Sequence, residues 1–514
     1  MVPANRTFSR VRLIALVTAA LLILAAALYV LRATLHRTGR RALLRFRARV
    51  DRYKFADKRE IVAALVGDAA IAEAVHTHAA AAGESESASW ARVHRYLDEI
   101  IPQFNVLAYY RLGYTAANAV LRLFWKVSVD SAAPGAVARL PRDAVVVYLI
   151  NHRSNADYIL VAWALAQRVS ISYAVGEWAR AFPLEFLFKR FGSYFIRRGY
   201  REVLYHTVLE RYVQHITAHG VTQGIFPEGG LTRDGRLRPG KVGLLDYILG
   251  TTRDPAMRER LVLVPVALNY DRVLEDRTLL RELRQREQAA AAPGRPPDGG
   301  RVAQFLDVSR FVAWNLGRLL TGRWRRYGRA AVIVGEPVRV APWLEEEAAR
   351  LGTDVLALPR DARLARVQAL CDHMLERIGR IIPVTPVPLA CAAIQSLEAD
   401  VIPRARLLAR MGEMRDVLLE LNGRVLRADR DIGETFDVAY RMLRMRRVLS
   451  RHGDAYVVLE HGRELVSYYA NSVAHLLGDF EAGVRARDAL PIDVATGQGQ
   501  GAPTSGVRTP SGMR

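Results

Sequence analysis

The sequence predicts an α/β protein: a domain with a mostly parallel sheet, flanked by N- and C-terminal helical regions and preceded by one N-terminal transmembrane helix. Three observations predict it. Short β-rich runs alternate with helical stretches from about residue 136 to 345, which is typical of parallel α/β sheets. The flanking stretches carry apolar residues at helical spacing. Leu13–Leu31 has no charged residue, and as a helix it is nearly long enough to cross a hydrocarbon core of about 30 Å.

Composition supports a folded chain with a sizeable core. The 514 residues are 51% hydrophobic and 25% charged, with a mean hydropathy of +0.02, which excludes collagen-like and intrinsically disordered proteins. The net charge of +22 indicates a polyanionic partner: nucleic acid, an anionic membrane face or a phosphorylated substrate. Cys371 and Cys391 are too few for a disulfide framework or a cysteine-based metal site.

The apolar N-terminal stretch favours a membrane over nucleic acid as the partner. More arginines follow the stretch than precede it, and the positive-inside rule then places the body of the protein in the cytoplasm. These arginines also suit the anionic lipids of the cytoplasmic leaflet. They are Arg6, Arg10 and Arg12 before the stretch, and Arg32, Arg37, Arg40, Arg41, Arg45, Arg47 and Arg49 after it. We therefore expect a single span in the inner membrane; the alternative is a cleaved signal peptide.

Composition divides the chain into five parts. We expect a membrane anchor (1–32), a helical region (33–135), an α/β domain (136–345), a C-terminal helical region (346–490) and a disordered tail (491–514). Expected strands are Ala144–Ile150, Ile171–Val175, Ser193–Ile196, Gly224–Phe226, Leu261–Leu268 and Ala331–Val334. Phe305–Arg326 mixes aromatic residues with arginine, which is typical of an interfacial helix and equally of a core helix with a basic outer face.

The first site motif follows the first strand of the α/β domain. The run ending at Ile150 is followed by Asn-His-Arg-Ser-Asn-Ala-Asp, so that His152 and Asp157 lie five residues apart at a strand-to-helix turn. With Ser154 or Asn155 as the helix N-cap, Asp157 lies in the first turn and can reach back to the imidazole. An aspartate held on Nδ1 orients His152 as a general base through Nε2. Alone, the pair is equally a capping and surface arrangement.

Three further motifs follow in order. Gly192–Arg198 ends a short strand with Arg197 and Arg198, whose guanidinium groups suit phosphate. Phe226–Gly230 supplies Glu228 and two glycines, followed by Arg233, Arg236 and Lys241, a pattern that favours anion binding by backbone N–H groups. Val264–Tyr270 is a strand whose proline indicates an edge or irregular position. Singly, each is also explained as a basic turn, a glycine loop or an edge strand.

Taken together, these motifs resemble the membrane-bound glycerol-3-phosphate acyltransferase family, within the glycerolipid acyltransferase superfamily that shares an HxxxxD motif. The blocks His-Arg-Ser-x-x-Asp-Tyr, Gly-x-x-Phe-Ile-Arg-Arg and Glu-Gly-Gly are all met. The resemblance covers about residues 55 to 480, because features of the glycerol-3-phosphate branch also stand at Gly335–Pro337, Val384–Pro386 and Tyr468–His475. One departure is Leu231, where that branch usually has arginine directly after Glu-Gly-Gly.

The resemblance implies an acyltransferase that moves a fatty acyl group from acyl-CoA or acyl-carrier protein to the 1-hydroxyl of glycerol 3-phosphate, forming lysophosphatidic acid. It implies His152 as base and Asp157 as its partner. Arg198 and Arg233 are the first candidates for binding the phosphate, and Arg197 and Lys241 the next. Arg153, beside His152, is expected to contact either the phosphate or only solvent. The remaining residues of the matched blocks expected at the substrate are Glu228, Gly229, Gly230, Pro265 and Tyr270. No cofactor is expected, and no metal, since the histidines show no paired ligand spacing.

Three alternatives stay open. Within the same class, the acceptor is dihydroxyacetone phosphate or 1-acyl-glycerol 3-phosphate, because the blocks are shared across the superfamily. From another class, the chain is a membrane-tethered module that binds nucleic acid, although no aromatic-basic recognition motif supports this. The third is a non-catalytic lipid-binding or scaffold protein, against which the intact His152 and Asp157 argue.

Overall fold

The computed structural model describes residues 58–103, 113–166, 169–176, 184–197, 199–291, 321 and 324–478. The predicted span at 13–31, Arg198, most of the predicted helix at 305–326 and the tail lie outside these residues. Within the described part, no single helix is long and apolar enough to cross a membrane. One pair, Lys58–Val66 and Ala69–Ala82, passes by length and composition but is bent by 63°.

A mostly parallel sheet forms the centre of the protein, as predicted. Its strand order is β1-β7-β6-β2-β5-β3-β4, with β8 paired to β6. Only the pairings of β6 with β7 and with β8 are antiparallel. The strands are β1 (Lys126–Ser131), β2 (Val145–Ile150), β3 (Ser172–Val175), β4 (Tyr194–Phe195), β5 (Gln223–Ile225), β6 (Leu261–Tyr270), β7 (Arg329–Val334) and β8 (Val338–Arg339).

Strand β2 lies in the middle and is buried on both faces. Its side chains alternate, with Val146, Tyr148 and Ile150 in one apolar cluster and Val145, Val147 and Leu149 in the other. A strand buried on both faces needs a continuous apolar sequence, which explains the run Val-Val-Val-Tyr-Leu-Ile. The central sheet therefore lies between two layers of helices.

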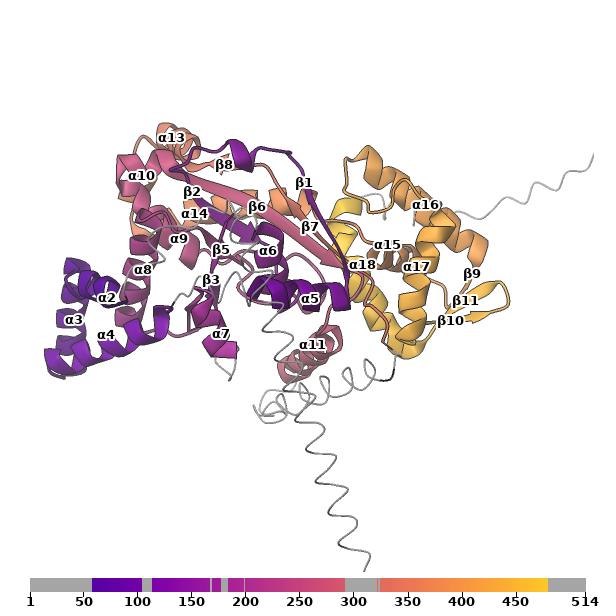
Figure 1. Cartoon of the computed structure of the whole chain (residues 1–514), viewed down its shortest axis with the longest axis horizontal. Coiled ribbons are helices and arrows are strands. Elements are labelled where there is room, and N and C mark those ends of the chain that lie inside the picture. Colours follow the sequence, from indigo (N-terminus) through magenta and orange to yellow (C-terminus); the bar gives the residue numbers. More distant parts are fainter. Residues whose placement is uncertain are drawn as a thin grey trace, which may run out of the picture.

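Helices cover both faces of the sheet (Figure 1). One apolar cluster includes α5 (Tyr114–Phe124), α6 (Asp157–Leu165), α7 (Leu184–Arg190) and α11 (Asp276–Ala291). It continues into α15 (Pro386–Ser396), α16 (Arg404–Glu420), α17 (Ile432–Met445) and α18 (Arg463–Leu477), which Figure 1 shows beside one end of the sheet. The other cluster includes α2 (Lys58–Val66), α3 (Ala69–Ala82), α4 (Glu86–Ile100), α8 (Val203–Ala218), α9 (Gly243–Leu249), α10 (Pro255–Arg260), α13 (Val340–Leu351) and α14 (Arg360–Arg380).

All six predicted strands are confirmed to within about two residues at most ends, but two regions predicted as helical also contain strands. β1 lies inside the stretch 33–135 and pairs in parallel with β7. Its sequence Lys-Val-Ser-Val-Asp-Ser alternates in the way of a half-buried strand, so tertiary pairing decides its state. The C-terminal region contains a three-stranded sheet, β10-β11-β9, with β9 (Val401–Pro403), β10 (Leu449–His452) and β11 (Ala455–Val458).

The proline of β6 lies at an irregular position, as predicted, but not at an edge of the sheet. On the side away from β2, Val266–Tyr270 pairs with β7 and Val262–Leu263 pairs with β8. Pro265 falls between these two ladders, where no backbone donor is required of it. Its carbonyl accepts a hydrogen bond from the Gly335 N–H at 2.8 Å.

Candidate active site

Three neighbouring strands bring the predicted motifs to one edge of the sheet. β2 pairs in parallel with β5 on one side and with β6 on the other. Their carboxyl ends therefore lie together, which is where open α/β sheets bind ligands. His152 follows β2, Glu228 follows β5 and Tyr270 ends β6. The Asn151 side chain ties two of these ends together, because its amide both donates to the Leu268 carbonyl at 3.0 Å and accepts from the Leu268 N–H at 2.8 Å.

His152 and Asp157 form a buried pair. The Nδ1 atom of His152 lies 3.0 Å from Oδ2 of Asp157, and the exposed fractions of the two side chains are 1% and 0%. The imidazole stacks on the Phe226 ring with 4.1 Å between centroids, and the edge of Tyr158 packs against it. With Nδ1 engaged by the carboxylate, Nε2 is the ring nitrogen that can accept a proton from a substrate.

Both carboxylate oxygens of Asp157 accept hydrogen bonds. Its Oδ2 also accepts the Arg153 N–H at 2.6 Å and the Ser154 N–H at 2.9 Å, and its Oδ1 accepts the Tyr270 hydroxyl at 2.6 Å. Asp157 lies in the first turn of α6, as predicted, but the predicted N-cap is wrong, since Ala156 occupies that position. The Ser154 hydroxyl instead accepts the Ala156 N–H within the turn, and Asp157 itself closes the turn.

Glu228 joins the first motif to the third. Its Oε1 accepts the His152 N–H at 2.7 Å and its Oε2 accepts the Arg238 N–H at 3.0 Å. The Thr232 N–H in turn donates to the His152 carbonyl. Burial raises the pKa of Glu228 to about 7, although these two backbone donors oppose the shift. Glu228 thus fixes the backbone on which the imidazole stands.

A second buried carboxylate, Glu275, was not among the predicted site residues. Its Oε2 accepts the Ser154 hydroxyl at 2.7 Å and its Oε1 accepts the Asn155 N–H at 3.2 Å. Burial raises the pKa of Glu275 to about 7. Glu275 lies five residues beyond the end of β6, between Asp271 and Asp276, and the sequence does not distinguish it from these acidic neighbours.

The C-terminal region forms part of the site through Arg153. This side chain is 3% exposed and donates to the Gly235 carbonyl at 2.8 Å and to the Ser472 carbonyl of α18 at 3.3 Å. Gly235 has φ +85, and a Cβ there would lie 1.9 Å from the Tyr468 carbonyl oxygen. Only glycine permits this approach of the loop after Glu228 to α18.

The predicted phosphate-binding residues lie in different surroundings. Arg198 lies outside the described residues. Arg197 makes a bidentate ion pair with Glu99 of α4 and stands over the rings of Tyr96, Tyr200 and Tyr205. Arg233 pairs through Nε with Glu282 of α11 at 3.0 Å and is half-buried.

The glycine loop carries the other predicted binding residues. Lys241 is exposed and crosses over Gly229, whose φ is +66 and where a Cβ would meet the lysine Cδ at 2.6 Å. Gly230 is partly buried beside it. Leu231, which stands where the resemblance leads one to expect arginine, packs its side chain against the apolar core. Within the described ranges, no three His, Cys, Asp or Glu side chains are grouped so that they could hold a metal ion.

Two family models match the part of the chain that carries this site and the region that follows it. An acyltransferase family model matches residues 137–269, which include both His152 and Glu228. A model of the glycerol-3-phosphate acyltransferase C-terminal region matches residues 313–479. The central sheet and the C-terminal region are thus each similar to a part of the acyltransferases that these models describe.

Curated relatives agree with the second model. Glycerol-3-phosphate acyltransferase of Aeromonas hydrophila is 27% identical over 79% of this chain and 48% of its own length. Those of Xanthomonas campestris and Xylella fastidiosa are each 26% identical over 86% of this chain, and over 48% and 50% of their own lengths. Family models and curated relatives thus agree that the chain is similar to glycerol-3-phosphate acyltransferases, which confirms the resemblance seen in its motifs.

The chain spans about half the length of the curated relatives it matches. Among solved structures, the 1-acyl-sn-glycerophosphate (LPA) acyltransferase of Thermotoga maritima matches with a TM-score of 0.28 and 15% identity, over 52% of this chain and 77% of that chain. A likeness at that level supports no statement about this chain.

Proposed function

We propose that this chain transfers a fatty acyl group from an acyl thioester, acyl-CoA or acyl-carrier protein, to the 1-hydroxyl of glycerol 3-phosphate, forming lysophosphatidic acid. The buried His152–Asp157 pair at the carboxyl end of β2 is the observation that carries the proposal. It supplies a general base whose orientation is fixed and whose cationic form is stabilised. The similarity of the C-terminal region to that of glycerol-3-phosphate acyltransferases supports this acceptor over dihydroxyacetone phosphate and 1-acyl-glycerol 3-phosphate.

The reaction needs one proton shuttle and no acyl-enzyme. Nε2 of His152 takes the proton of the glycerol 1-hydroxyl as that oxygen attacks the thioester carbonyl carbon, forming a C–O bond. The tetrahedral oxyanion then collapses, the C–S bond breaks, and the imidazolium returns the proton to the leaving thiolate. Asp157 stabilises the imidazolium in between. Because donors from Arg153, Ser154 and Tyr270 also hold Asp157, the pair cannot turn away from this geometry.

A product assay tests the proposal. The full chain, reconstituted in lipid, is given a labelled acyl-CoA or acyl-carrier protein and, separately, glycerol 3-phosphate, dihydroxyacetone phosphate and 1-acyl-glycerol 3-phosphate. We expect labelled lysophosphatidic acid from glycerol 3-phosphate with at least one donor. Labelled product only from another acceptor replaces the acceptor in the proposal, and no product from any acceptor favours the non-catalytic alternative.

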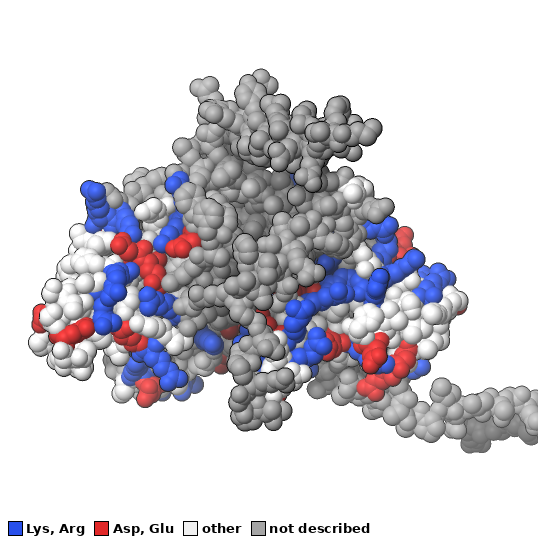
Figure 2. All heavy atoms as spheres, turned by 90° about the horizontal axis from the view of Figure 1, so that it is seen from below, with Lys and Arg blue, Asp and Glu red and all other residues white. Residues whose placement is uncertain are grey.

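We further propose that the protein works at an anionic membrane on its cytoplasmic face. The net charge of +22 and the arginines between residues 32 and 49 support this. Figure 2 shows a band of Lys and Arg side chains over the C-terminal region, and further Lys and Arg side chains mixed with Asp and Glu over the N-terminal helices. Exposed arginines of this region include Arg441, Arg444 and Arg447 at the end of α17. Vesicle sedimentation with and without anionic lipid tests the attraction, which should weaken as salt is added.

A further inference from the structure

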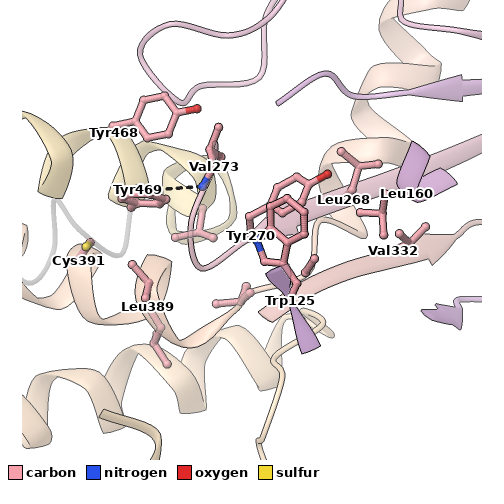
Figure 3. Close-up of a cluster of buried hydrophobic side chains, with 14 of the residues drawn as sticks. Trp125, Leu160, Leu268, Tyr270, Val273, Val332, Leu389, Cys391, Tyr468 and Tyr469 are labelled. Carbon is pink, nitrogen blue, oxygen red and sulfur yellow. Dashed lines mark hydrogen bonds between the residues drawn. The ribbon is translucent and has the colours of Figure 1, made fainter. Parts of the chain in front are cut away.

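Helix α18 places two adjacent tyrosines next to the catalytic end of the sheet, and their hydroxyl groups differ. Tyr469 is fully engaged: its hydroxyl accepts the Val273 N–H at 3.1 Å (Figure 3) and donates to Asp276 Oδ2 at 2.5 Å. Tyr468 is 1% exposed, yet its hydroxyl has no hydrogen-bond partner among the described residues. A buried hydroxyl without a partner costs free energy, so its retention needs a reason.

A second unpartnered donor belongs to Arg153, which contacts the loop and the helix that flank Tyr468. The Nε–H of Arg153 is also buried and lacks a partner within the described part of the chain, while both Nη atoms are engaged by carbonyls. The partners of those Nη atoms are Gly235, whose backbone abuts Tyr468, and Ser472, one helical turn after Tyr468. Burial raises the pKa of Tyr468, and the Arg153 cation is the largest influence that opposes this rise. The tyrosine is therefore a neutral O–H donor close to a positive charge.

The Tyr468 hydroxyl and the Arg153 Nε–H need the same kind of partner, a hydrogen-bond acceptor. A phenolic O–H and a guanidinium N–H are both donors, and no acceptor in the described part of the chain satisfies either. Residue Arg153 adjoins the His152–Asp157 pair, because its backbone N–H donates to Asp157 Oδ2 at 2.6 Å. An anionic oxygen bound between them would gain two hydrogen bonds, one of them charge-assisted.

We propose that Tyr468 of α18 and the Nε–H of Arg153 together bind a phosphate oxygen of the acceptor substrate, so that the C-terminal region contributes directly to acceptor recognition. This rests on the proposed function for the nature of the acceptor. It assigns to Tyr468 a role in substrate binding, and it explains why the loop at Gly235 approaches α18 so closely. The unpaired hydroxyl is a cost in the free protein that is recovered when substrate binds.

The experiment compares Tyr468→Phe with Tyr469→Phe, a matched pair of adjacent tyrosines in one helix. Glycerol 3-phosphate is titrated calorimetrically into each full-length variant in lipid without an acyl donor, and the thermal midpoint is measured in parallel. We expect Tyr468→Phe to weaken binding roughly ten- to hundredfold while leaving the midpoint unchanged or raised, because no existing hydrogen bond is lost. Tyr469→Phe should lower the midpoint, because it leaves the Val273 N–H and Asp276 without their partner.

Kinetics complete the test. The Michaelis constant for the acyl donor should stay unchanged in Tyr468→Phe, while that for glycerol 3-phosphate rises. Unchanged affinity in Tyr468→Phe overturns the inference, as does a loss of affinity accompanied by the same fall in midpoint as in Tyr469→Phe, which would make the role structural. These outcomes differ from failure of the proposed function, in which the wild-type chain acylates no glycerol 3-phosphate at all.

Discussion

The imidazole of His152 and the carboxylate of Asp157 meet at 3.0 Å inside the protein, five residues apart in the chain and at the turn that joins β2 to α6. The turn is compact because the carboxylate accepts two backbone N–H groups within it as well as the imidazole. One side chain therefore shapes the loop and orients the base. Loss of His152 should therefore reduce activity, whereas loss of Asp157 should reduce both activity and stability.

His152→Ala should reduce acyl transfer by at least roughly 10² to 10⁴, because no other group at the site replaces the base. The fold should survive, since the carboxylate of Asp157 keeps its donors from Arg153, Ser154 and Tyr270. Turnover with glycerol 3-phosphate and circular dichroism measure the two effects. Substantial turnover in a correctly folded variant would contradict the assignment of His152 as the base.

Tyr270→Phe should slow turnover roughly tenfold or more without a change in either Michaelis constant. The variant removes the hydroxyl that donates to Oδ1 of Asp157 at 2.6 Å, a hydrogen bond to a charged group worth about 1.5 to 3 kcal/mol. The carboxylate then holds the imidazolium less firmly. Steady-state kinetics with each substrate varied in turn check this, and a rise in the Michaelis constant for glycerol 3-phosphate alone would instead place Tyr270 at the substrate.

Glu275→Gln should lower the turnover number roughly tenfold, because an NH₂ donor replaces one of the two oxygens that accept from the Ser154 hydroxyl and the Asn155 N–H. The turn that carries His152 is then less firmly placed. Glu259→Gln is the matched control, since Glu259 is exposed and pairs only with Arg339 in the described part of the chain. Equal activity of the two variants would show that Glu275 does not position the turn that carries His152.

The same substitution should change how stability depends on pH. The pKa of Glu275 is raised from an ordinary value of 4.5 to about 7, so between these values the folded protein keeps a proton that the unfolded chain has lost. Stability therefore falls as the pH rises through this window, and the loss is complete above pH 7, at about 3 kcal/mol. Chemical denaturation at pH 5 and pH 8 should show a smaller fall for Glu275→Gln than for the wild-type chain. Parallel curves would show that Glu275 is not protonated in the folded state at pH 5.

Much of the sheet was predictable from sequence because its strands are buried on both faces and read as continuous apolar runs, as in Val145–Ile150. β1 was not, because its residues are partly exposed and only pairing with β7 makes them a strand. The hairpin of β10 and β11 was hidden in the same way within a region rich in helical periodicity. Two residues, Gly453 and Asp454, turn the chain there, and Gly-Asp between short alternating runs was the available signal.

The site was predictable where chemistry is local in sequence, as in the His152–Asp157 turn. It was not predictable where distant segments meet. Glu275 reaches the turn from 120 residues away, and α18 reaches Arg153 from more than 300. The roles of the arginines were the hardest to predict, because the sequence shows a charged side chain but not the residue that it contacts in the folded protein. Arg197 illustrates this, since Glu99 of α4 already neutralises it.

Arg197→Ala and Arg233→Ala should therefore differ. Arg197 makes two hydrogen bonds to Glu99 at 2.9 and 2.7 Å and contacts three tyrosine rings, so its loss should lower the thermal midpoint. Arg233 has a single contact to Glu282 and stands on the loop after Glu228. Its loss should raise the Michaelis constant for glycerol 3-phosphate roughly ten- to hundredfold. Saturation curves and melting curves for both variants test this. A raised Michaelis constant for glycerol 3-phosphate in Arg197→Ala, with an unchanged thermal midpoint, would show that Arg197 binds the phosphate.

Arg446 and Asp276 hold the C-terminal region against the end of the central sheet. Both side chains are buried, the pair is bidentate, and Tyr469 shares the same carboxylate. Arg446→Ala should cost about 3 to 5 kcal/mol, because it leaves an uncompensated buried carboxylate. Since α18 also contacts Arg153, acyl transfer should fall with it.

The double variant Arg446→Met with Asp276→Leu separates the charge effect from the contact itself. An apolar pair of similar volume should recover most of the lost stability, because neither side chain then carries a buried charge. Activity should return only in part, because Tyr469 loses the carboxylate that fixes its hydroxyl and, with it, part of the placement of α18. Denaturant unfolding and turnover, measured on the same preparations, test both statements. Full recovery of turnover would mean that the position of α18 does not depend on this pair.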